Sequence, residues 1–110
     1  MDGFTKQGKT PAQQAVLRSI ATYRTTKDEN VACGLITPHF LQVRFENKPE
    51  LCLAIARHQN KRELPKSASV ESIAGNAATV RIAEPTATRS LYKMKRLSGT
   101  WKIDDIVEAP

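Results

Sequence analysis

The sequence predicts an α+β fold, with helices in the N-terminal half packed on an antiparallel sheet from the C-terminal half. Up to Pro65, apolar residues recur at helical spacing behind recognisable helix-start signals. After Pro65 they alternate with polar residues, as in half-buried strands. Helices that precede the strands, rather than alternate with them, favour an α+β fold over a parallel α/β fold.

The first helix is predicted to begin at residue 11. Thr10 is placed to cap it, and Pro11 suits the first helical position, where a missing N–H is not needed. Gln13 follows Thr10 by three residues and completes a capping box. An apolar stripe at helical spacing then predicts the buried side of this helix. Its members are Ala12, Val16, Ile20 and Tyr23.

Shorter helices are predicted to follow the first one. Asp28 is a suitable cap for a helix through residues 31–35, and a second Thr-Pro pair at 37–38 predicts another one or two turns. The next helix is predicted over 49–62, where basic residues in the final turns complement the helix dipole. Pro65 prevents it from continuing.

Two hairpins are predicted in the C-terminal half. The first turns at Gly75-Asn76 and the second at Ser98-Gly99, where the residue types tolerate positive φ. In the first hairpin, Ala78, Val80 and Ile82 share one face, opposite Thr79 and Arg81. A two-residue turn in the second hairpin fixes the facing pairs across the strands. These pairs are Arg96 with Trp101, Met94 with Ile103, and Tyr92 with Asp105.

The second hairpin has one apolar and one charged face. The apolar face, which is expected to pack on the helices, carries Tyr92, Met94, Trp101 and Ile103. The opposite face carries Lys93, Lys95, Lys102 and Asp104. Pairing this face with its own copy would set lysines against lysines, so we expect a monomer or a weak homodimer.

Length and composition indicate one ordinary domain. The chain has 110 residues, 40% hydrophobic and 25% charged, and no apolar run that could cross a bilayer. The net charge of +6 would suit nucleic acid, an anionic lipid surface or an acidic partner. Nucleic acid is not favoured, because the basic residues form no continuous run and the six aromatic residues form no stacking platform.

Several motifs together resemble the nuclear-transport-factor-two-like (cystatin-like) superfamily, in particular its small secreted or lipid-anchored actinobacterial members. They are "ACGLITP" after the first helix, "ELCLAI", "GNAATV" and "GTWKID", in that order across residues 12–106. The resemblance implies a cone, in which a curved sheet wraps around helices and leaves a pocket at the open end. The short stretch "RELPKSAS" leaves room for few extra pocket-lining strands. We expect a flexible segment over 1–9 and a single domain over 10–110.

The residues alone leave the role of the two cysteines open. Cys33 and Cys52 are each followed by a histidine six positions later, but such pairs lie about 240° apart on a helix, which argues against zinc. The spacing is also not that of a redox pair. Buried free thiols and a disulfide both remain. The superfamily resemblance implies a Cys33–Cys52 disulfide, which would indicate an oxidising compartment.

Evidence for catalysis in the sequence is thin. Enzymes of the superfamily, such as ketosteroid isomerases, place acid–base residues inside the cone, and Asp105 opposite Tyr92 is the best candidate here. Tyr23 matches a position where some of these enzymes carry a hydroxyl donor. No catalytic residue transfers by motif, and no cofactor or metal is indicated. The candidate ligand-binding residues in the cone are Tyr23, Phe40, Tyr92, Met94, Trp101 and Asp105.

The sequence therefore predicts a non-enzymatic cell-envelope or extracellular domain. It would bind a small apolar ligand or a protein partner through its cone or its basic sheet face. The alternative is a small isomerase, cyclase or hydrolase of the ketosteroid-isomerase type. The first ten residues lack the apolar core of a signal peptide. A mature exported domain would look the same, so this observation does not separate the two locations. A cytoplasmic location is the alternative.

Overall fold

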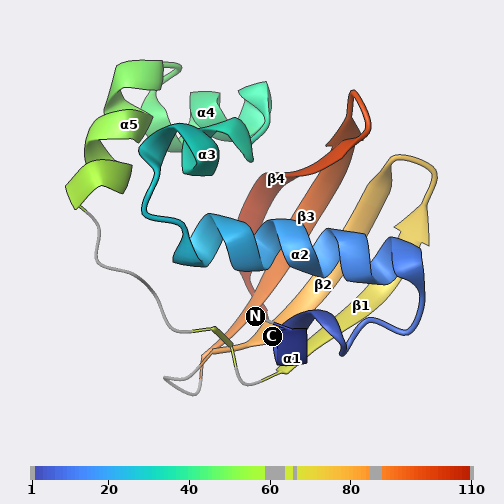
Figure 1. The fold of residues 1–110 in the computed structure, drawn as a ribbon. Coiled ribbons are helices and arrows are strands. Elements are labelled where there is room, and N and C mark those ends of the chain that lie inside the picture. The colour runs from blue at the N-terminus through green and yellow to red at the C-terminus, as the bar shows by residue number, and fades with distance from the viewer. Residues whose placement is uncertain (1, 59–63, 66, 85–87, 110) are drawn as a thin grey trace.

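The computed structural model describes residues 2–58, 64–65, 67–84 and 88–109, and these form helices followed by one antiparallel sheet (Figure 1). The helices are α1 (Asp2–Thr5), α2 (Pro11–Thr25), α3 (Glu29–Gly34), α4 (Pro38–Phe45) and α5 (Pro49–His58). The strands are β1 (Ser67–Ala74), β2 (Ala77–Ala83), β3 (Arg89–Leu97) and β4 (Thr100–Glu108), paired in the order β1-β2-β3-β4. The predicted α+β class is confirmed.

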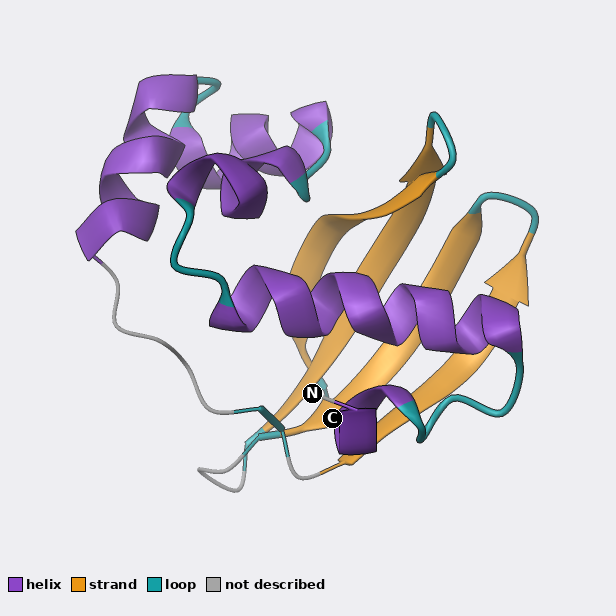
Figure 2. Ribbon diagram, viewed as in Figure 1, coloured by secondary structure: helices purple, strands orange, loops and turns teal. Residues whose placement is uncertain are grey.

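The helices cover only one face of the sheet. In Figure 2, α2 runs across this face with α1 beside it, and α3, α4 and α5 gather beyond one end of α2. We call the covered side the inner face and the other side the outer face. Within the described part of the chain, none of the helices combines the length and the apolar character that crossing a membrane requires.

The predicted helix starts are confirmed by their caps. The hydroxyl of Thr10 accepts a hydrogen bond from the Gln13 amide at 3.1 Å, and that of Thr37 accepts one from the Phe40 amide at the same distance. The Asp28 carboxylate accepts one from the Asn30 amide at 2.9 Å. Each cap satisfies an N–H that has no partner within its helix. The predicted end of the last helix, at 59–62, lies outside the described residues.

The N-terminal segment packs against the domain, which differs from the flexible segment expected for residues 1–9. Phe4 of α1 is only 4% exposed and belongs to the core. The Gln7 side chain accepts a hydrogen bond from the Ala68 amide at 2.9 Å, which ties the segment to β1. Gly8 is buried against α2, where a Cβ would lie 2.8 Å from the Gln14 nitrogen. The apolar ring and this close approach explain why the segment is packed.

The second hairpin has the predicted register near its turn and departs from it further along. Met94 faces Ile103 and Arg96 faces Trp101, as predicted. A β-bulge then inserts one residue into β4, so that Asp105 faces Lys93 and Ile106 faces Tyr92. The predicted pairing of Tyr92 with Asp105 is therefore wrong.

Residues 35–37 run beside β4 at the bulge. The Thr37 amide donates to the Ile103 carbonyl at 2.9 Å, and the Ile103 amide donates to the Leu35 carbonyl at 2.8 Å. The Thr37 hydroxyl also donates to the Asp104 carboxylate at 2.7 Å. These bonds explain the bulge. Asp104 accepts a hydrogen bond from Thr37 and has no paired residue on β3. These bonds also cover the edge of β4 at this point.

A disulfide joins Cys33 of α3 to Cys52 of α5, with the Cα atoms 6.1 Å apart. This confirms the bridge that the superfamily resemblance implied. Cys52 is 3% exposed. Because α5 packs on α3 and α4, the bridge ties together the small helical group that caps one end of the sheet.

We expect the disulfide to be formed in the purified protein and to contribute on the order of 3 kcal/mol to stability, since it closes a loop of about 20 residues. Alkylation of the unfolded, unreduced chain should add nothing to its intact mass, and alkylation after reduction should add two adducts. Two adducts without reductant would contradict the bridge. Denaturant unfolding of Cys33→Ser/Cys52→Ser should show the stability loss.

Candidate functional site

Four of the predicted cone residues lie in the packed core. Phe40 is 3% exposed, Tyr92 and Met94 are each 1% exposed, and Trp101 is 5% exposed. These four side chains keep almost no surface accessible to water, so together they form a packed core and not the lining of a deep, open cone. A ligand bound among them would have to displace them. Their ligand-binding role stays a prediction.

The other two predicted residues are less buried than these four, although Tyr23 packs against the same core cluster. Tyr23 is half-buried on α2. Asp105 faces Lys93 across the strands, and its carboxylate lies 3.6 Å from the Arg44 guanidinium. The bulge thus places Asp105 in a charged, partly exposed setting instead of opposite Tyr92. The acid–base role suggested for it loses its geometric basis.

A buried polar network that the sequence analysis missed connects α2 to the sheet. The Arg24 guanidinium donates to both carboxylate oxygens of Glu84, at 2.9 and 3.1 Å, and to the Tyr92 hydroxyl at 3.0 Å. The Arg24 side chain is 4% exposed and that of Glu84 is 15% exposed. A signal was present in the sequence, because Arg24 follows Ile20 by four residues and so continues the buried side of the helix.

The network keeps the Arg24 guanidinium protonated. Burial by itself lowers the pKa of Arg24, but the Tyr92 hydroxyl and the Glu84 carboxylate outweigh burial and raise it above its ordinary value. Arg24 is therefore protonated at every physiological pH and does not act as a general base. Both Glu84 oxygens are already engaged by Arg24, so the arrangement favours a structural ion pair over an acid–base centre.

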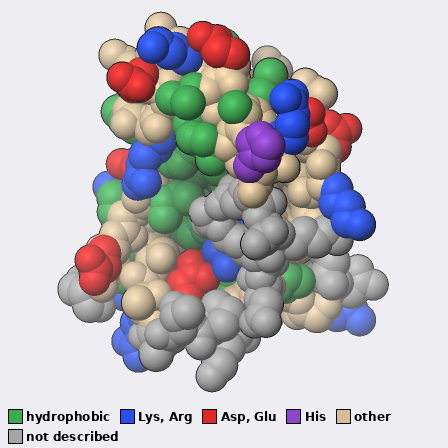
Figure 3. Space-filling model, turned by 90° about the vertical axis from the view of Figure 1, so that its left-hand side faces the viewer, with side chains coloured by type: hydrophobic (Ala, Val, Ile, Leu, Met, Phe, Trp, Pro, Cys, Tyr) green, Lys and Arg blue, Asp and Glu red, His purple; other side chains and the backbone are tan. Residues whose placement is uncertain are grey.

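Metal ligation finds no support among the described residues. They contain no group of three or more His, Cys, Asp or Glu side chains that could hold a metal ion. His39 and His58 are exposed, and both cysteines are in the disulfide. Figure 3 shows one side of the molecule, where acidic, basic and hydrophobic side chains of the described residues are interspersed.

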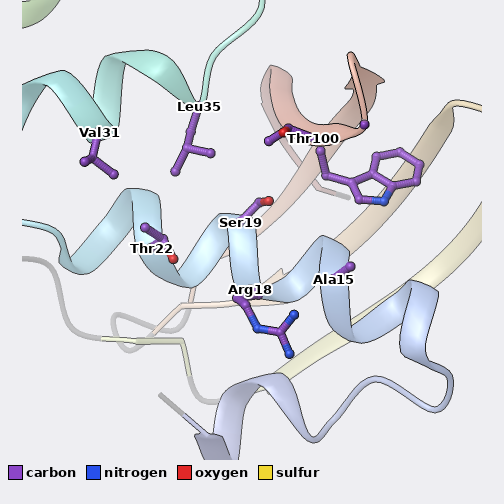
Figure 4. A pocket seen from close by; sticks show the side chains of 9 residues that line it. Ala15, Arg18, Ser19, Thr22, Val31, Leu35 and Thr100 are labelled. Atoms are coloured by element: carbon purple, nitrogen blue, oxygen red, sulfur yellow. The ribbon is translucent and has the colours of Figure 1, made fainter.

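An open groove lies between α2, α3 and the β3–β4 turn. It has a volume of about 310 Å³. Figure 4 shows Val31 of α3 and Leu35, the residue that follows α3, pointing toward α2, with Thr100 at the start of β4 nearby. Ala15 and Trp101 add apolar wall. The volume is at the lower end of the roughly 300–1,000 Å³ range of small-molecule pockets.

The outer face of the sheet carries the most distinctive charge arrangement. We call the side chains of Arg81, Lys93, Lys95 and Lys102 on this face the basic face. Lys95 lies directly opposite Lys102 across β3 and β4. Lys95 is 4.0 Å from Asp104, and Arg81 is 3.1 Å from Glu71. Within the described part of the chain, Lys93 and Lys102 form no ion pair.

No family model and no curated protein matches the chain. Among solved structures, it is similar to an NTF2-like protein of unknown function from Shewanella baltica OS155, with 13% identity, a TM-score of 0.48, and coverage of 93% of this chain and 98% of that one. The fold described above defines the class: an α+β domain with helices on one face of a four-stranded antiparallel sheet.

Proposed function

We propose that this domain is a non-enzymatic module that binds an acidic protein partner through its basic face. The observation that carries the proposal is the direct pairing of Lys95 with Lys102. Like charges placed opposite each other destabilise a sheet by a few tenths of a kcal/mol up to about 1 kcal/mol. Asp104 lies 4.0 Å from Lys95, and a partner's carboxylate placed between the two amines would add to this neutralisation and would also pair with Lys102.

The isomerase, cyclase or hydrolase alternative has less support. Such an enzyme needs a titratable group beside an open cavity. In the described part of the chain, the inner face presents buried apolar side chains and the Arg24–Glu84–Tyr92 network. Asp105 lies away from this face, against Lys93 and Arg44. These placements favour binding over catalysis.

A small apolar ligand is the second candidate function. The observation in its favour is the groove of Figure 4, whose walls include Val31, Leu35 and Trp101. The groove lies on the helical side of the molecule, so a ligand there would leave the basic face free. The two functions therefore use separate surfaces and are separable by experiment.

We also propose a location and an assembly state for the protein, from the disulfide and from the basic face. The disulfide supports a cell-envelope or extracellular location, since thiols are kept reduced in the cytosol. The basic face is self-repelling in an isologous pair, which supports a monomer or a weak homodimer. A monomer would leave this face open to a partner.

Charge reversal on the basic face tests the proposed function. We expect a fluorescent glutamate peptide to bind the protein at low salt and to bind more weakly at physiological salt, because the attraction is screened. Lys93→Glu/Lys95→Glu should weaken binding about tenfold or more. The matched control is Lys9→Glu/Lys27→Glu, which changes the net charge equally at exposed positions flanking α2. Equal losses in both double variants would contradict a specific basic face.

A further inference from the structure

The basic face ends at a small apolar pocket. The pocket has a volume of about 240 Å³ and lies between α4, the start of α5 and the edge of β4. Its walls are the Cys33–Cys52 disulfide, Ile36, Leu41 and two prolines, Pro38 and Pro49. We call this the disulfide pocket. It is smaller than the roughly 300–1,000 Å³ pockets that hold small-molecule ligands, so its size suits a single side chain.

The walls of the disulfide pocket are held in place before anything binds. The disulfide links α3 to α5, and the two prolines have fixed φ angles. Thr37, also in the lining, is 2% exposed and is bonded to Phe40, Ile103 and Asp104. A preformed site loses little conformational entropy when it is filled, so even a small apolar contact contributes to affinity.

Lys102 connects the pocket to the basic face. It lines the disulfide pocket, and it is the residue that faces Lys95 across the sheet. Lys93 lies two residues from Lys95 on the same outer face. Consider a bound chain segment whose carboxylates pair with these lysines. Its residues next to the carboxylate over Lys102 would lie at the pocket, because Lys102 is part of the pocket wall. Charge and apolar surface are thus continuous across this edge of the molecule.

We propose that the disulfide pocket receives an apolar side chain from the acidic segment that the basic face binds. This inference rests on the proposed function and adds a chemical definition of the partner. The partner would be an acidic chain segment with an apolar anchor residue among its carboxylates. Residues that dominate binding energy cluster in well-packed pockets from which water is excluded, and the disulfide pocket would give an apolar anchor this setting.

Two labelled peptides test the inference. One is a short glutamate peptide with a central leucine, and the other has serine in place of the leucine. For the wild-type protein, we expect the leucine peptide to bind with a Kd about tenfold lower than that of the serine peptide. Burial of one leucine side chain in the pocket contributes enough free energy for a change of this size. Leu41→Ser should abolish this difference and leave binding of the serine peptide unchanged.

Control variants separate the pocket from general effects. Leu41→Met keeps an apolar wall of similar volume and should retain the preference for leucine. Val43→Ser removes an apolar side chain that is 53% exposed on the same helix, outside the pocket, and should also retain it. Thermal unfolding of each variant checks that the fold is intact.

The outcomes distinguish the two levels of the proposal. If both peptides bind the wild-type protein equally, the anchor inference is overturned and the basic face stands. If the preference for leucine persists in Leu41→Ser, the disulfide pocket is not its source and the inference is again overturned. If neither peptide binds at low salt, the proposed function fails and the anchor inference fails with it.

Discussion

Replacing Trp101 by alanine should destabilise the protein by about 3–5 kcal/mol, the usual loss for a large buried aromatic side chain. Trp101 is 5% exposed and belongs to the core cluster formed by the inner face and the helices. Its ring also lies 5.7 Å from the Arg96 guanidinium, which partly covers it. Alanine would remove these contacts and leave a cavity. Equilibrium unfolding in urea measures the effect.

Lys102 provides the control for this prediction, since it is the next residue and points to the outer face. Lys102→Ala should change the free energy of unfolding by no more than about 0.5 kcal/mol. The removal of its repulsion with Lys95 makes a slight stabilisation the expected direction. A larger loss for Lys102→Ala than for Trp101→Ala would mean that the two faces of β4 have been exchanged by a one-residue slip.

Replacing Glu84 by glutamine should also cost about 3 kcal/mol or more, because it leaves the charge of Arg24 buried without its carboxylate. Arg24 is held at 2.9 and 3.1 Å by the two Glu84 oxygens, with a side-chain exposure of only 4%. Glutamine keeps the shape of the side chain, but it is neutral and only its carbonyl oxygen can accept, so one of the two bonds from Arg24 is lost. The midpoint of thermal unfolding should fall accordingly.

The exposed ion pair between Arg81 and Glu71 is the matched control for Glu84. Its side chains are 36% and 41% exposed, and Arg81 donates one hydrogen bond to Glu71 at 3.1 Å, so this is an arginine–glutamate pair at a similar distance but with far less burial. Glu71→Gln should cost less than about 1 kcal/mol. Equal and small losses for the two variants would show that the Arg24–Glu84 pair is open to solvent and not part of the core.

The features of the fold that depend on local sequence were predictable. Thr10, Asp28 and Thr37 each cap the helix that they were expected to cap, and the turns fall at residues 75–76 and 98–99. These features are set by residue types within a few positions of each other. The apolar alternation of β2 and the first part of β4 likewise specified which side chains enter the core.

The features that were missed depend on contacts between distant residues. The bulge in β4 occurs where Asp104 is hydrogen-bonded to Thr37, 67 positions earlier in the chain. No local sequence pattern predicts that contact. Arg24 enters the core because Glu84, 60 positions away, neutralises it. Phe4 joins the core only because α1 folds back beside α2.

In the candidate site, too, the features set by local sequence were predictable and those assembled from distant segments were not. The lysines of the basic face were predicted from alternation alone. The pairing of Lys95 with Lys102 required the register of the hairpin, which the two-residue turn supplied. The disulfide pocket was not predictable, because it is assembled from α3, α4, α5 and β4. The superfamily resemblance supplied the cysteine bridge that forms part of its wall.

The most direct test of the basic face is a titration of ¹⁵N-labelled protein with the glutamate peptide, followed by amide chemical shifts. We predict that the largest changes occur at Lys93, Lys95 and Lys102 and at their neighbours on β3 and β4. The amides of α2 should change little. Largest changes along α2 and α3, at the groove of Figure 4, or no saturable change at low salt, would contradict binding through the basic face.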